Sequence, residues 1–354
     1  MTSQEKGRHA SRPSVNDETG EAAACAASVP GRICIAGESL DWMTGDASIT
    51  AAIPARTTVR AARGGDSDVV TFRVGEPFNA SQRVLLPELG RLSNTPARYL
   101  QATAYELATA TTVDLRGLTL SSETDLPVAA GTSSSAAVTV AASAAILGLV
   151  KALDRSLDTA VAHAHSAETV HLGTGAGWMD FLACGHGGVV RIQPNAGPKV
   201  TRLAESLQCS IVLVDTMERR KTPTVLATKR ARFERADPAL NTYVDEVGHV
   251  VRELTGRLAS TSIAHDAVGA LVSHAQELLR RLVGCSTELI DECAARMMNA
   301  GAFGAKLSGS GYGGCLFALA PPDAVASIRS ALSTLPITTH LFDDCEPRGL
   351  LPGA

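Results

Sequence analysis

A loop of small residues at 125–137 leads directly into a long alanine-rich segment with helical spacing. The N-terminus of a helix attracts anions, because its unpaired backbone N–H groups and its dipole both favour negative charge. Serine hydroxyls at that end can also bind phosphate or Mg²⁺. The pattern therefore predicts a phosphate site, and the alternative is that Thr132 or Ser133 simply caps the helix. The chain has no Walker P-loop of the form G-x-x-x-x-G-K-[ST].

A second glycine-rich run, GAKLSGSGYGGC at 304–315, contains a literal G-x-G-x-x-G at Gly309, Gly311 and Gly314. A dinucleotide-binding turn follows a strand and opens a helix, whereas here a helix is expected before the run and a strand after it. We therefore reject a dinucleotide site. The glycines still indicate backbone in conformations closed to other residues, or a close approach to a ligand, and a glycine hairpin is the alternative.

A third run, PGRICIAGESLDW at 30–42, places Arg32, Glu38 and Asp41 around a short strand and a glycine turn. One cation and two carboxylates can bind a polyhydroxylated ligand, because carboxylates accept hydrogen bonds from neighbouring hydroxyls in pairs. A surface ion pair explains the same residues equally well.

Composition narrows the class of protein that must position these residues. A length of 354 residues predicts two domains or one large interleaved unit. With 45% hydrophobic residues, 19% charged residues and a formal charge of −4, the chain has neither a disordered composition nor a broad nucleic-acid footprint. The eight cysteines lack C-x-x-C pairs and zinc spacing, which predicts reduced thiols in a cytoplasmic protein. The longest apolar stretch, 136–150, is too short to span a bilayer, so we expect no membrane partner.

The order of expected elements predicts an α+β fold. Residues 1–28 lack an apolar segment and are expected to be a disordered leader. The proline and glycine residues at 194–198 mark a boundary between a strand-rich domain at 29–195 and a helix-plus-sheet domain at 196–354. Strands are expected at 33–36, 49–53, 57–61, 69–74, 113–121, 187–192, 211–215 and 316–320. Helices are expected at 97–109, 133–153, 156–170, 224–236, 240–258, 265–282, 286–300 and 324–335.

Taken in this order and spacing, the three runs resemble the motifs of the GHMP kinases, the superfamily of galactokinase, homoserine kinase, mevalonate kinase and phosphomevalonate kinase. The resemblance extends over 29–320 and is closest to the galactokinase-like branch. The P-G-R-x-x-x-x-G-E-H-x-D-Y of that branch is similar to 30–42, and its G-A-x-x-T-G-x-G-x-G-G-C is similar to 304–315. Its C-G-I-M-D-Q resembles 176–181.

The resemblance implies a two-domain GHMP kinase fold with the active site in the inter-domain cleft, and phosphoryl transfer from ATP to a small-molecule hydroxyl. It implies that Asp180 accepts or orients the hydroxyl proton and that Arg32 neutralises developing charge. Glu168 and the hydroxyl of Ser135, or of Ser134, match the Mg²⁺ ligands. The expected ATP-binding residues are Pro127, Ala130, Gly131, Thr132, Ser133, Ser134, Ser135, Ala136, Gly309 and Gly311.

Departures from the galactokinase pattern bear on the substrate. Ser39 stands in place of histidine and Trp42 in place of tyrosine, which argues against galactose itself. The other residues expected to bind the acceptor, Glu38, Asp41 and Gly177, match the pattern. We therefore expect a ligand with several hydroxyls: another sugar, an amino sugar or a cyclitol.

Two other functions remain open. The chain could be a non-catalytic, galactokinase-like ligand sensor, although Arg32 and Asp180 weigh against this. It could also be a GHMP kinase for a non-sugar alcohol such as an amino acid. Either a monomer or a homodimer is compatible with the sequence.

Two groups of residues resemble functional clusters but are expected to have no catalytic role. His163, His165 and His171 lie close together in the sequence but lack carboxylate or cysteine partners at metal-ligand spacing. The basic run at 229–232 is expected to be solvated charge, although one of its residues could reach the substrate or the phosphates.

Overall fold

The computed structural model describes residues 24–64, 67–128, 130–150, 153–195, 197–219, 222–343 and 347–353. The strands are β1 (Ala24–Ala36), β2 (Ser48–Arg63), β3 (Val69–Val74), β4 (Ala80–Leu85), β5 (Leu118–Thr124), β6 (Val189–Gln193), β7 (Lys199–Ala204), β8 (Ser210–Asp215), β9 (Gly304–Leu307), β10 (Cys315–Ala320), β11 (Thr338–Phe342) and β12 (Leu351–Gly353). The α-helices are α1 (Leu40–Met43), α2 (Arg98–Ala110), α3 (Ser134–Gly148), α4 (Leu157–Ser166), α5 (Met179–His186), α6 (Thr222–Glu234), α7 (Pro238–Leu258), α8 (His265–Leu278), α9 (Glu288–Asn299) and α10 (Val325–Leu332). The α+β fold class is confirmed.

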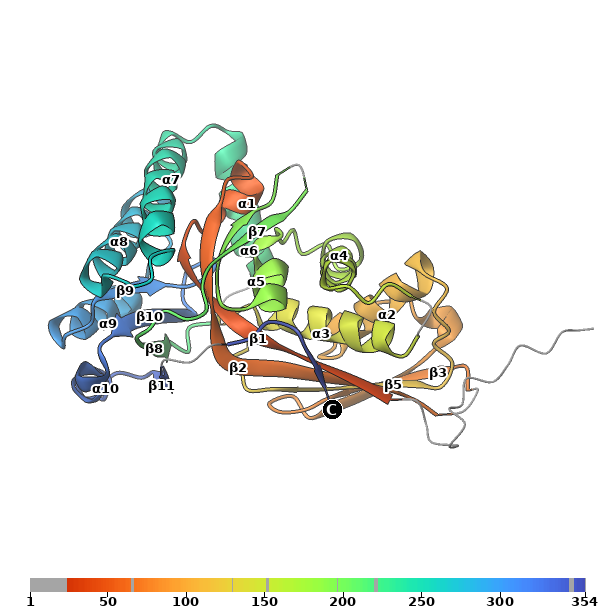
Figure 1. Cartoon of the computed structure of the whole chain (residues 1–354). Helices are drawn as coiled ribbons and strands as arrows, with labels where there is room; N and C mark the ends of the chain where they lie inside the picture. Colours follow the sequence, from red (N-terminus) through yellow and green to blue (C-terminus); the bar gives the residue numbers. More distant parts are fainter. Residues whose placement is uncertain are drawn as a thin grey trace, which may run out of the picture.

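Two sheets divide the molecule into two lobes (Figure 1). The first sheet has the order β12-β1-β2-β5-β3-β4, and β6 and β7 extend it from β2. The second sheet has the order β11-β8-β10-β9. Strands β8 and β10 are buried along their whole length, which agrees with their continuous apolar sequences.

The long strand β2 joins two segments, 49–53 and 57–61, that the sequence pattern presents as separate strands. Its first part, Ser48 to Ala51, pairs with β6, and the part from Thr57 pairs with β5. Pro54 lies where β2 changes from one partner to the other, and a proline without an N–H donor is tolerated at such a point. One bent strand therefore replaces two (Figure 1).

The ends of the first lobe differ from the sequence-based boundaries. Residues 24–28 belong to the expected leader, but they form the beginning of β1 and pair with β2 and β12. The rest of that leader, 1–23, lies outside the described residues. The boundary expected at 195 falls inside a hairpin, because β7 pairs with β6 in the first sheet. The chain first changes sheets between β7 and β8, and it returns to the first sheet at β12.

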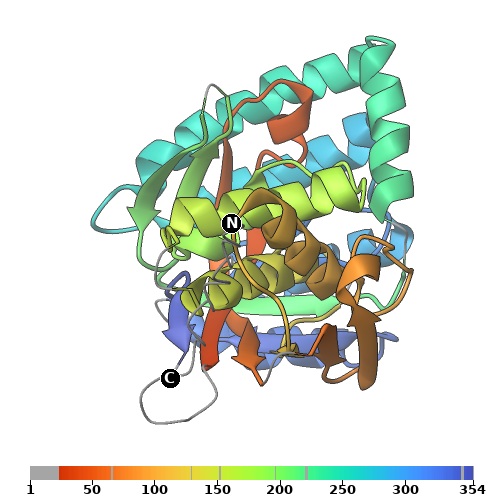
Figure 2. The same cartoon turned by 90° about the vertical axis from the view of Figure 1, so that its right-hand side faces the viewer.

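The helix α3 is the central helix of the first lobe. It packs against β1 and β2 on one side and against α2, α4 and α5 on the others, and Figure 2 shows α4 stacked beyond α3 relative to the sheet. Its many alanines suit this position, because a helix buried on several sides needs small side chains. The helix expected at 156–170 ends as a π-helical segment, Ala167–His171, which follows α4 directly.

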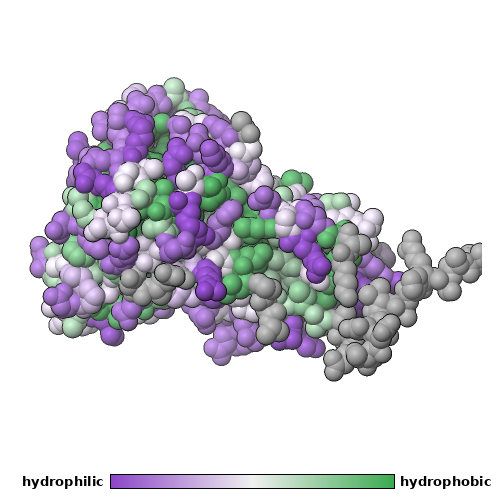
Figure 3. Space-filling view, viewed as in Figure 1, coloured by the Kyte–Doolittle hydropathy of each residue, from purple (hydrophilic) through white to green (hydrophobic). Residues whose placement is uncertain are grey.

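The second lobe places α7, α8, α9 and α10 around the four-stranded sheet (Figure 1). α7 also contacts β1 and β2, so it bridges the lobes. On the face shown in Figure 3, hydrophilic residues cover most of the α7 and α8 region, and apolar surface gathers towards the middle of the molecule. In the part of the chain that the structure describes, no helix combines the length and apolar character needed to cross a membrane.

A buried ion pair connects the two lobes. Glu38, just after β1, accepts a hydrogen bond from Lys306 Nζ on β9, and their side chains are 2% and 0% exposed. Lys306 Nζ also donates to the carbonyl oxygen of Leu307 at 2.8 Å, and Tyr243 Oη on α7 donates to the carbonyl oxygen of Glu38 at 2.9 Å. Three elements from distant parts of the chain are therefore fixed at one point.

We expect Lys306→Met to lower the free energy of unfolding by about 3–5 kcal/mol, because it leaves the Glu38 carboxylate buried without its cation. The double variant Lys306→Met with Glu38→Leu should recover much of that loss. Chemical denaturation of the purified protein measures both values, with the exposed Lys199→Met as the control. A single variant as stable as the control would show that the pair does not hold the lobes together.

Candidate active site

The side chain of Arg32 on β1 is the centre of the candidate site. It is 2% exposed. Its Nε and Nη2 donate to Asp180 Oδ1 at 3.0 and 2.5 Å. Its Nη1 donates to the carbonyl oxygen of Gly131 at 2.5 Å and lies 3.4 Å from Ser308 Oγ. One guanidinium thus joins the three runs that the sequence singled out and the 176–181 segment.

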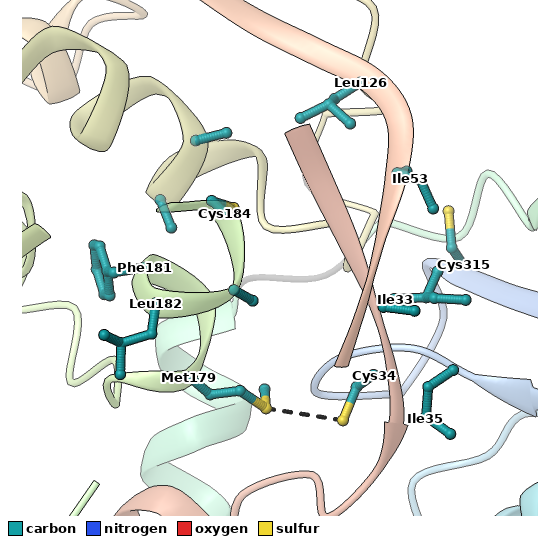
Figure 4. Close-up of a cluster of buried hydrophobic side chains, with 14 of the residues drawn as sticks. Ile33, Cys34, Ile35, Ile53, Leu126, Met179, Phe181, Leu182, Cys184 and Cys315 are labelled. Carbon is teal, nitrogen blue, oxygen red and sulfur yellow. Dashed lines mark hydrogen bonds between the residues drawn. The ribbon is translucent and has the colours of Figure 1, made fainter. Parts of the chain in front are cut away.

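Asp180 is the second residue of the short helix α5, whose other side chains anchor it in the core. Met179, Phe181 and Leu182 are buried, and Met179 Sδ lies 3.8 Å from Cys34 Sγ of β1 (Figure 4). The Asp180 side chain, by contrast, is 30% exposed. Apolar packing on one face of α5 therefore presents the carboxylate on the other face.

The expected phosphate loop is shaped by two residues with positive φ, Gly131 at 95° and Ser133 at 62°. Ser133 is the N-cap residue of α3, yet its side chain makes no capping hydrogen bond. Thr132 Oγ1 donates instead to the carbonyl oxygen of Pro127 at 3.1 Å. Capping by Ser133 or Thr132 therefore does not account for these hydroxyl residues, and the helix terminus fits an anion.

The second glycine-rich run, at 304–315 in the other lobe, packs against the expected phosphate loop. Gly309 has a φ of 85°, and a Cβ there would lie 3.0 Å from the Cα of Gly131, so a side chain would press on the loop. Cys315 N–H donates to the carbonyl oxygen of Ala130 at 2.5 Å. Gly311 lies against Cys285 instead. The glycines therefore bring two backbones together, in agreement with the close approach expected from the sequence.

A buried carboxylate lies on the π-helical segment after α4. Glu168 is 2% exposed and accepts hydrogen bonds from the hydroxyls of Thr139, at 3.3 Å, and Ser135. Burial raises the pKa of Glu168 to about 8, and the negative charge of Asp180 adds to the rise. A divalent cation at Glu168 and Ser135 would offset the cost of this charge, so the donor set fits Mg²⁺.

A Mg²⁺ ion at Glu168 and Ser135 would need few protein ligands. Among the residues that the structure describes, there is no group of three or more His, Cys, Asp or Glu side chains arranged to hold a metal. Mg²⁺ commonly binds through one or two protein oxygens, with phosphate oxygens and water completing its shell.

Three residues that the sequence predicts to bind the acceptor, Asp41, Trp42 and Gly177, lie next to one another. Asp41 accepts hydrogen bonds from the N–H groups of Trp42, at 3.1 Å, and Met179, at 3.4 Å. A Cβ at Gly177 would overlap the Asp41 carboxylate, so only glycine permits this contact. Burial raises the pKa of Asp41 to about 6, together with the charge of Asp180. Two carboxylates therefore lie close together beside the phosphate loop.

Two other residues expected to bind the acceptor, Glu38 and Ser39, are more buried than Asp180. Glu38 is buried in its ion pair with Lys306, and Ser39 is 8% exposed with a φ of 70°. Of the two carboxylates of the first run, the structure brings only Asp41 beside Asp180. The sequence showed no sign of the Lys306 partner, because 268 residues separate the pair.

Sequence patterns missed Ser308, which holds the centre of the site together. Its Oγ accepts from Cys34 N–H at 3.2 Å and donates to the carbonyl oxygen of Gly131 at 3.0 Å. It lies 3.4 Å from Arg32 Nη1 as well. Ser308 occupies the threonine position of the glycine-rich family motif, and that was the available signal.

Two of the three histidines contact a carboxylate that lies far away in the sequence. Glu106 of α2 contacts both His163 Nδ1, at 3.0 Å, and His171 Nε2, at 2.7 Å. The partner comes from another helix, so spacing along the sequence could not reveal it. His165 stacks on Trp178 instead, with ring centroids 3.8 Å apart, and burial lowers the pKa of His165 to about 4.

Comparison with known proteins agrees with this geometry. Residues 98–188 match the family model described as GHMP kinases N terminal domain, and 259–337 match GHMP kinases C terminal. A mevalonate kinase of Thermococcus sibiricus is 27% identical over 327 residues, covering 89% of this chain and 95% of that relative. A galactokinase of Mycobacterium tuberculosis is 27% identical over 352 residues, covering 87% of this chain and 92% of that relative.

Solved structures show the same fold. Lactococcus lactis galactokinase complexed with galactose has a TM-score of 0.79 and 19% identity, covering 93% of this chain and 95% of that chain. Methanococcus jannaschii mevalonate kinase has a TM-score of 0.73 and 20% identity, covering 90% of this chain and 98% of that chain.

Fold, site and relatives together define a phosphotransferase with an alcohol group as acceptor. The chain belongs to the GHMP kinase superfamily, in which galactokinases and mevalonate kinases are both among its relatives. Kinases of this superfamily use ATP as the phosphate donor.

The buried Glu168 predicts a pH-dependent stability. In the unfolded chain this carboxyl ionises near pH 4.5, whereas in the folded chain its pKa is about 8. The folded state therefore holds the extra proton between these values, and this contribution to the free energy of unfolding is lost as the pH rises through that window. We expect Glu168→Gln to flatten the fall in stability between about pH 5 and pH 8.

Denaturation curves at several pH values, without divalent metal, measure this slope. Glu123→Gln, at an exposed carboxylate of β5, is the matched control and should keep the wild-type slope. Identical slopes in the wild type and Glu168→Gln would contradict a protonated, buried Glu168.

Proposed function

We propose that the chain transfers the γ-phosphoryl group of ATP to a hydroxyl of a small polyhydroxylated molecule: a sugar, an amino sugar or a cyclitol. The observation that carries the proposal is the partly exposed Asp180 carboxylate. Arg32 holds it between the phosphate loop on one side and Asp41 on the other.

The geometry supports different tasks for Asp180 and Arg32. Both Arg32 bonds to Asp180 end on Oδ1, which leaves Oδ2 to accept the hydrogen bond of a substrate hydroxyl. Asp180 would orient that hydroxyl and take its proton. Nη1 of Arg32 lies at Gly131 of the phosphate loop, where its charge would stabilise negative charge on the transferred group.

ATP and Mg²⁺ fit the surrounding residues. The N-terminus of α3 would hold the phosphates, and Ser135 with Glu168 would hold Mg²⁺, which when bound supplies positive charge to the phosphate oxygens. Removal of Mg²⁺ would leave Glu168 and Asp180 as neighbouring carboxylates without that cation.

The acceptor would lie against Asp41, Trp42 and Gly177. Asp41 is able to accept hydrogen bonds from substrate hydroxyls, and the ring of Trp42 supplies an apolar face for a sugar or cyclitol. A non-sugar alcohol is the second candidate. The burial of Glu38 favours it, because one carboxylate instead of two then remains for a polyhydroxylated ring.

ATP consumption measured over a panel of sugars, amino sugars, cyclitols and non-sugar hydroxy compounds separates these candidates. Turnover with a member of the first three groups supports the proposal, and turnover confined to the last supports the second candidate. ATP and ligand binding without turnover on any acceptor would indicate a non-catalytic sensor and contradict the proposal.

We expect Asp180→Asn to lower kcat by about 10²–10⁴-fold, because the amide cannot accept the hydroxyl proton. ATP binding should persist, since the amide is similar in size to the carboxylate. Asp323→Asn, at an exposed position before α10, is the control and should keep wild-type turnover. Wild-type turnover by Asp180→Asn would contradict the role proposed for Asp180.

A further inference from the structure

A cationic side chain of the second lobe reaches the acceptor side of the site. Arg230 lies on α6, and its Nη2 donates a hydrogen bond of 2.8 Å to the carbonyl oxygen of Gly175. Gly175 belongs to the loop that leads into α5, five residues before Asp180. The loop that precedes α5, the helix of the proposed base, is therefore in direct contact with Arg230.

The guanidinium of Arg230 also lies on an aromatic face. Its Cζ is 4.8 Å from the ring centroid of Trp42, the residue that follows Asp41. Trp42 in turn packs edge-on against Phe233, one turn further along α6, with ring centroids 6.3 Å apart. A guanidinium stacked on an indole is held in a fixed plane, and its N–H groups point outward within that plane.

Arg230 differs from the nearby arginines in its charge partners. Nearby arginines of the same region are paired: Arg232 with Asp237 at 2.8 Å, and Arg219 with Asp215 at 2.7 Å. Within the residues that the structure describes, Arg230 forms no ion pair, although it is partly buried. The hydrogen bond from Arg230 to Gly175 uses one of the five N–H donors of the guanidinium.

The two acceptor-side carboxylates contact groups other than Arg230. Asp41 accepts from the backbone N–H groups of Trp42 and Met179, and Asp180 accepts from Arg32. A partly buried arginine with spare donors, on the surface where the acceptor would lie, matches the planar geometry of a carboxylate or phosphate.

We propose that Arg230 is a specificity-determining residue that binds an anionic group, carboxylate or phosphate, on the acceptor. The inference rests on the proposed function and narrows its substrate class to acidic or phosphorylated hydroxy compounds. Asp180 faces the hydroxyl that receives the phosphoryl group, and Arg230 holds the anion at the other end of the same molecule. A neutral sugar would leave the spare donors of Arg230 without an acceptor.

The test compares matched neutral and anionic acceptors. The panel contains D-galactose, D-galacturonate and D-galactose 6-phosphate, and R-mevalonate with its neutral primary amide, which keeps both hydroxyls, as a non-sugar pair. Binding by calorimetry in the presence of a non-hydrolysable ATP analogue and steady-state turnover are measured for the wild type, Arg230→Gln and Arg230→Lys. Arg235→Gln, at the exposed residue just after α6, removes the same charge and is the control.

We expect the wild type to prefer the anionic member of a pair, with galacturonate or mevalonate identifying a carboxylate and galactose 6-phosphate a phosphate. Arg230→Gln should raise KM for that acceptor by about ten- to hundredfold, as for the loss of a charged hydrogen bond, with a small change in kcat. Arg230→Lys should recover part of the loss, and KM for ATP should stay constant.

Four results would overturn the inference. The first two concern the wild type: preference for the neutral acceptors, or no binding of the anionic acceptors at all. The other two concern Arg230→Gln: an equal loss of affinity for neutral and anionic acceptors, or a rise in KM for ATP instead of KM for the acceptor. Turnover of a neutral sugar would then still support the proposed function. Conversely, anion binding that depends on Arg230 without phosphoryl transfer would support the inference and contradict the proposed function.

Discussion

The buried guanidinium of Arg32 is the constraint on which the rest of the site depends. A charge out of contact with water is tolerated only when it is paired and hydrogen-bonded. Arg32 meets this requirement through Asp180 of α5, the carbonyl oxygen of Gly131 and the hydroxyl of Ser308. These partners come from three separate segments, so the contacts that stabilise the charge also fix the proposed base, the proposed phosphate loop and the glycine-rich run relative to one another.

The charge of Asp180 acts on two buried carboxyl groups near this centre. The pKa values of Asp41 and Glu168 rise to about 6 and about 8, first because of burial and then because of the charge of Asp180. A nearby cation lowers the cost of ionising such groups, so the arrangement fits Mg²⁺ at Glu168. It also fits a second cation, Arg230, which forms no ion pair within the described part of the chain.

Sequence patterns predicted the local elements and the motif residues better than the contacts between them. Residues 69–74 form β3 as expected, and Arg32, Gly131 and Asp180 come together at one point. The π-helical segment that carries Glu168 could not be expected, because apolar periodicity does not reveal a local change in hydrogen-bond register. The Glu38–Lys306 and Glu106–His163 contacts join distant segments, and a pattern along the chain carries no record of such partners. Glu38 consequently seemed to face the acceptor, whereas it is buried between the lobes.

The most direct test of this account is a double-mutant cycle between Arg32 and Asp180, measured as the single-turnover rate of phosphoryl transfer on folded protein. If the two side chains act as one unit, the double variant Arg32→Gln with Asp180→Asn should be about as slow as the slower single variant. Rate losses that multiply in the double variant would show that Arg32 and Asp180 act independently, and would contradict the central role assigned to their contact.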